Sequence, residues 1–309
     1  MSTAPVIDVE NLHLRYGDFQ AVRDVSFQVQ RGELYALLGT NGAGKTSTLE
    51  IIEGHRRPTS GEVRVFGRSP RERGAVRPKL GIMLQESGFS PDLTVKESVQ
   101  LIGALTLRED RVERVLGVVD LTRKAGTLVS QLSGGEKRRL DFATAVWGSP
   151  ELVFLDEPTT GLDISSRDDL WTAVDELRNG GATVVLTTHY LEEAQQRADR
   201  VGLMHRGELR REGSVAELTR QLPGVIRFGL PPTAPRPPVE ASSQPDGTHV
   251  VETFALARDL KHLLQWADDH RVELQGLSAG PTRLDDVFRT LDADDPAQPA
   301  PSAASAARS

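Results

Sequence analysis

The sequence predicts an α/β protein with a large domain over residues 1–220 and a small second α/β domain over 221–291. Three observations lead to this prediction. A glycine-rich run at 39–46 lies between a strand pattern and a helix pattern, a second apolar run at 152–155 ends in two carboxylates, and the composition changes near residue 222. Strands that alternate with loops and helices in this way are typical of α/β folds.

The run at 39–46 fits the pattern G-x-x-x-x-G-K-[ST] of a phosphate-binding loop. Its glycines let backbone N–H groups point at phosphate oxygens, Lys45 can reach the β- and γ-phosphates, and the Thr46 hydroxyl can ligate Mg²⁺. The predicted strand at 33–38 enters the loop, and the predicted helix at 46–52 presents its N-terminus to the anion. The sequence therefore predicts a nucleoside triphosphate site; the alternative is a glycine-rich turn that arises by chance. The predicted binding residues are Gly39, Thr40, Asn41, Gly42, Ala43, Gly44, Lys45, Thr46 and Ser47.

Two carboxylates, Asp156 and Glu157, follow the apolar run at 152–155 and precede a proline. The run predicts a buried parallel strand whose carboxyl end opens on a site. Asp156 would hold the magnesium ion, directly or through water, and Glu157 would activate the attacking water as general base. The alternative is an ordinary Asp-Glu turn after a core strand, which the upstream loop disfavours.

Three further side chains lie where they can complete such a site. Gln85 follows a short apolar run, and its amide can contact the metal ion and the water. His189 follows a β-branched strand at 182–188, where a neutral imidazole can donate to the γ-phosphate. Tyr16 precedes the loop, and its ring can stack on a base. The structural alternatives are a polar strand end for Gln85, a structural histidine and a half-buried surface tyrosine.

A second glycine-containing run opens a helix further along the chain. The run Leu-Ser-Gly-Gly-Glu at 132–136 precedes a stretch, 137–146, whose periodicity predicts a helix. Ser133 and the glycines would cap this helix and offer N–H groups to an anion. Because the loop at 39–46 already forms a complete phosphate cradle, this second anion site suits a γ-phosphate presented by another subunit. The alternative is a plain helix cap. The predicted contacts are Ser133, Gly134, Gly135 and Glu136.

In this order, the runs resemble the nucleotide-binding subunit of an ABC transporter over about residues 6–218. The resemblance implies a P-loop NTPase fold of ABC type, with a mixed sheet core, an antiparallel β subdomain and a helical subdomain over 92–147 that contains the signature. It also implies ATP and Mg²⁺ as ligands and places Asp163 at the nucleotide. Glu136 departs from the glutamine usual in the signature, and Thr40 replaces the commoner Pro, His or Ser. The matching elements are the aromatic loop at Tyr16, Walker A at 39–46, the Q-loop at Gln85, the signature at 132–136, Walker B at 152–157, the D-loop at 161–163 and the H-loop at His189.

Within this family, the chain resembles the ATPase subunits of drug and antibiotic exporters typified by daunorubicin resistance, in the stretches 54–62, 188–193 and 281–288. This resemblance implies ATP hydrolysis coupled to transport and a homodimer, or a dimer with a related ATPase subunit. It also implies a separate integral-membrane permease that holds the chain at the cytoplasmic face of the membrane. The family resemblance places the permease contact at 86–96, with Phe89 and Leu93 exposed. The alternative is that both pack inside the helical subdomain.

Two other functions remain as alternatives. One is the ATPase of an ABC importer, although many sugar-importer ATPases have a longer C-terminal β domain. The other is a soluble ABC ATPase acting on DNA or ribosomes, which needs zinc modules, long coiled coils or two cassettes; this chain has no cysteine. A net charge of −7 does not suggest a nucleic-acid partner. No apolar run approaches the roughly 18 residues of a membrane span, so recruitment to a membrane would need another chain.

The second domain is predicted from short patterns after residue 222. It is expected to stabilise the dimer or contact the permease, with a regulatory site as the alternative. The tail at 292–309, rich in Ala, Pro and Ser, is predicted to be disordered. The predicted elements are a proline-rich connection at 231–238, a strand at 250–256, a helix with Leu260, Leu263, Leu264 and Ala267 on one face, a strand at 273–277 and a helix at 283–291.

Overall fold

The computed structural model describes residues 4–85, 88–106, 108–220, 222–232, 234–244 and 246–293. Contacts within the chain divide it into two compact units, Met1–Ala216 and Glu217–Ser309. This division falls a few residues before the boundary expected after residue 220. Within the described part of the chain, no helix is long and apolar enough to cross a membrane.

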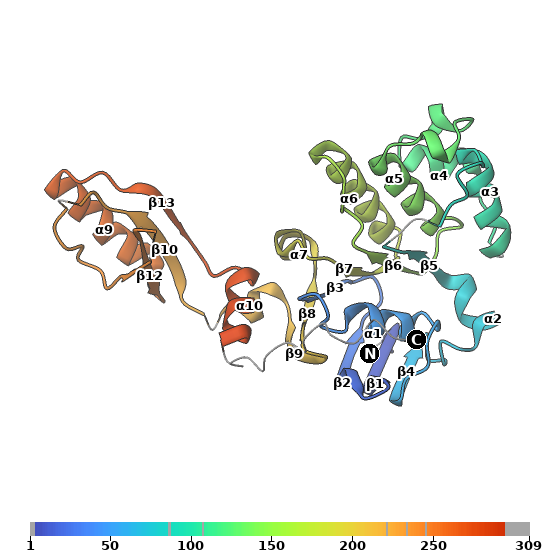
Figure 1. Ribbon diagram of the computed structural model, residues 1–309, viewed down its shortest axis with the longest axis horizontal. Coiled ribbons are helices and arrows are strands. Elements are labelled where there is room, and N and C mark those ends of the chain that lie inside the picture. Colours follow the sequence, from blue (N-terminus) through green and yellow to red (C-terminus); the bar gives the residue numbers. More distant parts are fainter. Residues whose placement is uncertain are drawn as a thin grey trace, which may run out of the picture. The chain divides into compact units, whose positions relative to one another are not determined.

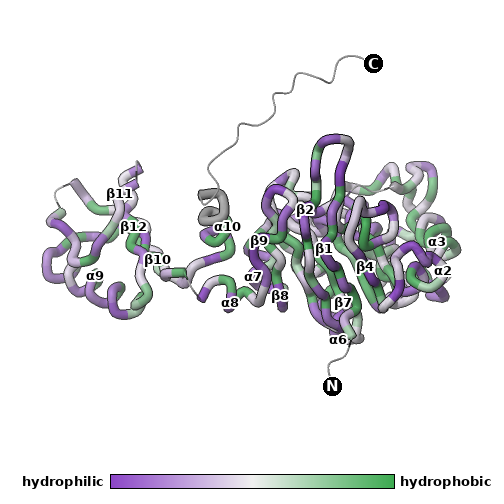
Figure 2. Tube along the Cα trace, turned by 90° about the horizontal axis from the view of Figure 1, so that it is seen from below, coloured by the Kyte–Doolittle hydropathy of each residue, from purple (hydrophilic) through white to green (hydrophobic). Residues whose placement is uncertain are grey.

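The first unit begins with an antiparallel sheet, which has the strand order β2-β1-β4 in the described residues. Strand β1 buries Ile7, Val9, Leu12 and Leu14, and the alternation of buried and exposed residues shifts by one between Val9 and Leu12, where Asn11 has a φ of 45°. Figure 2 shows this sheet, with β1 between β2 and β4. A turn at Gly17, with a φ of 58°, joins β1 to β2 as a hairpin. The strands are β1 (Ile7–Tyr16), β2 (Phe19–Val29) and β4 (Ser60–Val65).

A larger sheet forms the centre of this unit, with the order β5-β6-β7-β3-β8-β9 in the described residues. The strands from β5 to β8 in this order are parallel, and β9 closes the edge antiparallel to β8. The parallel strands are rich in Val, Leu and Ile, as expected of strands covered on both faces. Their carboxyl ends therefore meet at one edge of the sheet. The strands are β3 (Leu34–Gly39), β5 (Leu80–Met83), β6 (Leu152–Asp156), β7 (Thr183–Thr187), β8 (Arg200–His205) and β9 (Glu208–Gly213).

Helices cover both faces of the central sheet. Helix α1 packs between this sheet and the antiparallel sheet, because Leu49 of α1, Leu12 of β1 and Phe154 of β6 belong to one core. Helices α3, α4, α5 and α6 lie on the opposite side of the central sheet (Figure 1). These layers confirm the predicted fold class. The helices are α1 (Lys45–Ile52), α2 (Arg73–Val76), α3 (Val95–Thr106), α4 (Val112–Val118), α5 (Gly134–Ala145), α6 (Ile164–Asn179) and α7 (Leu191–Arg197), with short 3-10 turns at Arg77–Lys79, Thr122–Lys124 and Val129–Gln131. Helix α8 (Val215–Arg220) spans the boundary between the two units.

The second unit packs helix α9 against an antiparallel sheet with the order β11-β12-β10-β13 in the described residues. Phe228, Val251 and Leu263 lie in the core between them. Leu264, which was predicted on the buried face of the helix, is 43% exposed, and Trp266 is buried instead. The elements are β10 (Gly224–Gly229), β11 (Ser242–Ser243), β12 (Thr248–Thr253), α9 (Leu256–His270), β13 (Gln275–Gly280) and α10 (Leu284–Ala293).

The elements of the second unit depart from the sequence prediction in places. Strand β10, which was not predicted, precedes the proline-rich segment at 231–238, so that this segment lies inside the unit. Strand β12 ends at Thr253, whose hydroxyl accepts the N–H of Ala255 at 2.9 Å and turns the chain into α9. Helix α10 extends to Ala293, into the stretch predicted to be disordered, and residues 294–309 lie outside the described residues.

Candidate functional site

The candidate residues follow four adjacent parallel strands. Strand β3 ends at Gly39, where the glycine-rich loop begins, and Gln85 comes shortly after β5. Asp156 ends β6, and His189 lies just beyond β7. Because β5, β6, β7 and β3 are neighbours in this order, their carboxyl ends place the loop, the amide, the carboxylates and the imidazole along one edge of the sheet.

The loop at 39–46 is curled so that glycine is required in it. Gly42 and Gly44 have φ values of 79° and 97°, in the left-handed region that favours glycine. A Cβ atom on Gly44 would also lie 2.6 Å from the carbonyl oxygen of Ala21. Helix α1 starts directly after the loop at Lys45, so the N–H groups of its first turn remain free of helix partners and face the same side. This cradle fits a phosphate.

Lys45 lies over the loop that precedes it. Its Nζ donates to the carbonyl oxygens of Gly39 and Thr40 at 2.6 and 3.2 Å. Burial lowers the pKa of Lys45, and the nearby carboxylates of Glu157 and Asp156 oppose that shift. The ammonium group is thus close enough to the two carboxylates for their negative charge to affect its pKa. A phosphate in the cradle would offer this ammonium group stronger, charge-assisted hydrogen bonds than the carbonyls do.

Tyr16 lies beside the same loop. Its hydroxyl is 3.1 Å from the Ser47 hydroxyl, and the Arg56 guanidinium is 4.8 Å from the centre of its ring. The ring is 41% exposed, so it remains accessible to a ligand. Arg56 already covers part of the ring through a cation–π contact. A base that stacks on Tyr16 therefore either uses the other face or displaces Arg56.

The carboxylate pair is held by the neighbouring strand. The Thr187 hydroxyl of β7 donates to Asp156, and the Glu157 N–H donates to the Thr187 carbonyl at 3.0 Å. Glu157 has a φ of 51°, an unusual backbone conformation for a residue with a side chain. Its side chain is 13% exposed. The two carboxylates thus have different surroundings: Asp156 accepts the Thr187 hydroxyl, whereas Glu157 contacts His189 and accepts the Thr160 hydroxyl at 3.4 Å.

His189 contacts Glu157 directly. The imidazole Nδ1 and a carboxylate oxygen of Glu157 are 2.5 Å apart. An ionised carboxylate only accepts hydrogen bonds, so Nδ1 is the donor in this pair. A neutral ring that donates from Nδ1 has an acceptor at Nε2. The neutral imidazole that the sequence predicts as a donor to the γ-phosphate must therefore leave Glu157 or move its proton to Nε2.

Oxygen donors for a cation are available at the same edge. Thr46 and Gln85 are exposed, and Asp156 is half-buried. Within the described residues, no group of three or more His, Cys, Asp or Glu side chains forms a cage for a metal ion. A hydroxyl, an amide and one carboxylate match Mg²⁺, which usually binds one or two protein carboxylates together with phosphate oxygens and waters. The residues present therefore fit a magnesium ion that arrives with a triphosphate.

The run at 132–136 forms the N-terminal cap of α5. The Glu136 N–H donates to the Ser133 hydroxyl at 3.2 Å, and the Ser133 N–H donates to the Glu136 carboxylate at 2.9 Å. These two bonds make a capping box. Lys124 donates to the other carboxylate oxygen of Glu136. The extra charge of Glu136 is thus engaged within the chain, while Ser133 remains exposed.

Asp163 caps the next helix in a similar way. One oxygen of its carboxylate accepts the Ser166 N–H at 2.7 Å and the Ser165 hydroxyl at 3.1 Å. This accounts for an acidic residue at the N-terminus of α6 without a ligand. A nucleotide contact by Asp163 would have to use its second oxygen.

Replacing Glu136 by glutamine is expected to have a small, pH-dependent effect on stability. Hydrogen bonds from Lys124 and the Ser133 N–H lower the pKa of Glu136 in the folded chain. Ionised Glu136 therefore stabilises the folded chain above the pKa that it has in the unfolded chain, and this stabilisation is lost as the pH falls through the lower, folded-state pKa. Glutamine keeps the capping box but not the ion pair, so we expect a loss of about 1 kcal/mol or less at pH 7. Urea unfolding should show this difference shrinking below about pH 4.3. A difference that is constant with pH would contradict the ion-pair explanation.

Arg138 is a candidate that the sequence reasoning missed. It lies on the buried face of α5, is 6% exposed, and donates to backbone carbonyls that follow both β5 and β6. In the sequence, the signal that could have indicated Arg138 is its position in a helix whose neighbouring turns are apolar. A buried arginine is rare unless its donors are satisfied, but the sequence alone does not say by which groups.

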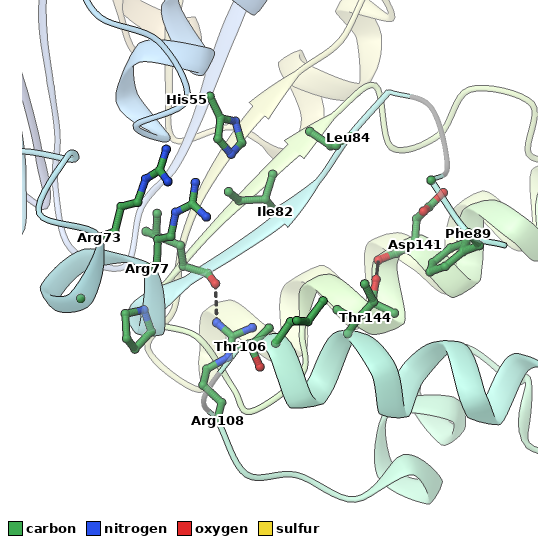
Figure 3. A pocket seen from close by; sticks show the side chains of 16 residues that line it. His55, Arg73, Arg77, Ile82, Leu84, Phe89, Thr106, Arg108, Asp141 and Thr144 are labelled. Atoms are coloured by element: carbon green, nitrogen blue, oxygen red, sulfur yellow. Dashed lines mark hydrogen bonds between the residues drawn. The ribbon is translucent and has the colours of Figure 1, made fainter.

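A groove of about 570 Å³ opens beside the segment that contains Gln85. Figure 3 shows His55, Arg73 and Arg77 at one end and Phe89 with Asp141 at the other. Leu84, 52% exposed, contributes to its apolar lining, as do Ile102 of α3 and Leu105, 72% exposed. Phe89 is half-buried in the groove wall, whereas Leu93 does not line it.

Comparisons with family models cover both units. A model of the family described as ABC transporter matches residues 22–160. A second model, described as the C-terminal domain of ABC transporter domain-containing protein-like sequences, matches residues 224–282. The first match contains the loop, Gln85, the capped run at 132–136 and the carboxylate pair.

Individual relatives extend these matches. The chain is 38% identical over 224 residues to a daunorubicin resistance ATP-binding protein of Streptomyces coeruleorubidus, covering 71% of this chain and 71% of that one. It is 33% identical over 314 residues to a Nod factor export ATP-binding protein I of Ralstonia nicotianae, covering 94% and 95%. A solved dimeric ATP-binding cassette, in a post-hydrolysis state bound to ADP and Pi, is similar with a TM-score of 0.63 and 27% identity, over 67% of this chain and 98% of that one.

Proposed function

The chain belongs to the ABC transporter family of ATP-binding proteins and is an ATPase, and from this premise we propose that it is the motor subunit of an exporter. Two copies close on two ATP molecules, and hydrolysis reopens the pair. This cycle drives a separate integral-membrane permease, to which the chain is bound at the cytoplasmic face of the membrane. The exported cargo is a drug, an antibiotic or another hydrophobic small molecule.

The observation that supports a two-copy cycle is the presence of two anion cradles in one chain. The first is the glycine-rich loop before α1, and the second is the exposed cap of α5 at Ser133. Helices α1 and α5 lie on different sides of the central sheet (Figure 1). In the described residues, the run at 132–136 hydrogen-bonds within itself, with Lys124 and with the adjoining backbone at Val129 and Lys137, and no hydrogen bond joins it to the loop at 39–46. A second copy is therefore the natural source of a phosphate for Ser133.

Within each site, the residues divide the work of hydrolysis. The loop and Lys45 hold the β- and γ-phosphates, and Tyr16 contacts the base. Thr46, Gln85 and Asp156 hold Mg²⁺, which neutralises phosphate charge when bound. Glu157 takes a proton from the attacking water, and His189 orients the Glu157 carboxylate through their hydrogen bond.

Export is favoured over import by the relatives that resemble this chain over most of its length. One is named for daunorubicin resistance and another for Nod factor export. The second of these matches covers the C-terminal unit as well as the ATPase unit. One name refers to resistance to a drug and the other to export, and this chain is proposed to serve an exported cargo.

The groove beside Gln85 is the proposed docking site for the permease. Leu84 and Leu105 give it an exposed apolar lining. In the described residues, its charged lining is mostly basic, from Arg73, Arg77 and Arg108, and Asp141 is the acidic member. Neither Arg73 nor Arg77 forms an ion pair within the described residues, and both are exposed. This chemistry fits a short amphipathic helix with an apolar face and acidic residues at one end.

The docking proposal predicts an effect of charge reversal in the groove. The double change Arg73→Glu and Arg77→Glu should reduce copurification with the proposed permease by about tenfold or more, because two complementary pairs become repulsive. ATP hydrolysis by the isolated subunit should stay within about twofold of the original, since neither residue belongs to the nucleotide site. Both quantities are measured on coexpressed and on separately purified proteins.

Arg71→Glu is the matched control for this experiment. Arg71 is exposed on the same segment and does not line the groove. It should leave copurification unchanged, which separates a local effect from a general effect of negative charge. Intact permease binding by a folded double variant would remove the groove from the docking role.

A further inference from the structure

The five N–H donors of the Arg138 guanidinium all have backbone partners. Nη1 donates to the carbonyls of Leu84 and Gln85 at 2.6 and 3.0 Å. Nη2 donates to the carbonyl of Asp156 and, at 2.6 Å, to that of Glu157; Nε donates to the Pro158 carbonyl at 3.3 Å. Only arginine has five donors in a rigid plane, so neither lysine nor glutamine can reproduce this pattern.

These partners belong to two different parts of the first unit. Leu84 lines the groove proposed for docking, and Gln85 follows it directly. Asp156 and Glu157 form the carboxylate pair after β6. Asp141, one turn further along α5, also lines the groove, and its carboxylate lies 3.9 Å from the guanidinium. Arg138 is thus the common neighbour of the groove and the carboxylates.

The bond to the Glu157 carbonyl acts on a residue whose backbone conformation is unfavourable. A φ of 51° costs a non-glycine residue roughly 1 kcal/mol or more and persists only where surrounding contacts hold it. The Glu157 N–H is held by Thr187 and its carbonyl by Arg138. Release of the second contact would let the peptide rotate and move the carboxylate away from its position beside His189.

We propose that Arg138 is a positioning residue: it fixes the carboxylate of Glu157 and couples that carboxylate to the backbone of the groove at Leu84 and Gln85. A helix that enters the groove and displaces Leu84 then changes the position of Glu157 through one rigid guanidinium. The inference rests on the proposed function in two respects, the role of Glu157 as base and the use of the groove for docking. It adds the physical link between them.

The test uses the full chain with Arg138→Lys and Arg138→Gln. The turnover number should fall by about 10- to 100-fold in both, because displacement of a reacting group by about 1 Å has effects of this size. The dissociation constant for the Mg²⁺ complex of the non-hydrolysable analogue AMP-PNP should change by less than about threefold, since no group of the phosphate loop is altered. Arg139→Lys is the matched control, because Arg139 donates to a single carbonyl, that of Val119, at 3.1 Å.

Hydrogen exchange supplies a second measurement, whose result would not change if Arg138 had a purely structural role. In the original chain, Mg²⁺–AMP-PNP should slow amide exchange both at 84–85 and at 156–158. Part of the slowing at 84–85 comes from Gln85, which is proposed to hold Mg²⁺ itself, and this part should remain in Arg138→Gln. The part that passes through Arg138 should be lost, so slowing at 84–85 should be smaller in the variant while slowing at 156–158 persists. Slowing at 84–85 equal to that in the original chain would overturn the coupling.

Other outcomes separate this inference from the function on which it rests. A turnover number for Arg138→Lys within about twofold of the original would overturn the positioning role. If turnover, nucleotide affinity and thermal stability fall to the same extent in the Arg138 variants, Arg138 has only a structural role. If a parallel Glu157→Gln variant keeps its turnover, the assigned base is wrong, while hydrogen exchange at 84–85 and 156–158 still tests the link itself.

Discussion

Replacing Glu157 by glutamine should lower the turnover number for ATP by about 100- to 10,000-fold, the usual contribution of a general base. Glutamine has the same shape, so it can keep the contact with His189 and the left-handed backbone conformation. It cannot take a proton from water. Because the loop, Lys45 and Asp156 are unchanged, ATP should still bind, and the variant should accumulate as an ATP-bound dimer.

The measurement is a comparison of single-turnover hydrolysis and nucleotide affinity in the two proteins. Gel filtration with Mg²⁺ and ATP should show the dimer only when Glu157 is replaced, because the original chain hydrolyses the nucleotide and separates. Glu176→Gln is a suitable control, since Glu176 is an exposed carboxylate on α6 away from the strand ends. Near-normal hydrolysis by Glu157→Gln would remove this residue from the catalytic role.

The sequence predicts the fold well because its main signals are local. A short Val- and Leu-rich strand followed by a glycine or an acidic residue fixes where a parallel strand ends, and parallel ends lie together. The run at 34–39 and the run at 152–156 both have this form. Their relation to each other then follows from the fold class and needs no knowledge of side-chain contacts.

The contacts between side chains could not be predicted in the same way, because they join distant parts of the chain. The His189–Glu157 contact changes the expected proton arrangement of the imidazole. Glu136, predicted among the contacts to a phosphate of another subunit, is engaged by Lys124 of its own chain. Arg138 has partners in two strand-end segments, so no single window of sequence reveals its role.

The pattern in the second unit failed for a related reason. On an isolated helix, Leu264 and Leu263 are equally good candidates for the buried face. Contact with the sheet buries Leu263 and Trp266 and leaves Leu264 exposed. The sheet that an amphipathic helix covers thus decides which of its apolar residues are buried. A wide apolar stripe in the sequence does not define the buried face by itself.

The second large effect should come from two mutations, each of which disables one of the two anion cradles. Lys45→Ala removes the ammonium group from the loop, and Ser133→Arg places a bulky cation at the exposed cap of α5. Each homodimer should be inactive, with turnover lowered by about 100-fold or more, since both of its sites lack one half. Loss of the cap should lower the stability of Ser133→Arg by about 1 kcal/mol, which thermal melting can verify. Its intact loop should still bind ATP, which shows that the variant is folded.

Tandem-linked dimers turn this into a test of whether each site is shared between copies. With Lys45→Ala in one half and Ser133→Arg in the other, one shared site keeps an intact loop and an intact cap, and the linked dimer should regain up to about half of the original activity. With both changes in the same half, each shared site has one defect, and the linked dimer should be inactive. If each site were instead built within one chain, the two results would be exchanged: the dimer with both changes in one half would be active and the other would not. ATP hydrolysis by the two linked proteins therefore distinguishes the arrangements directly, because composition, fold and number of mutations are the same in both.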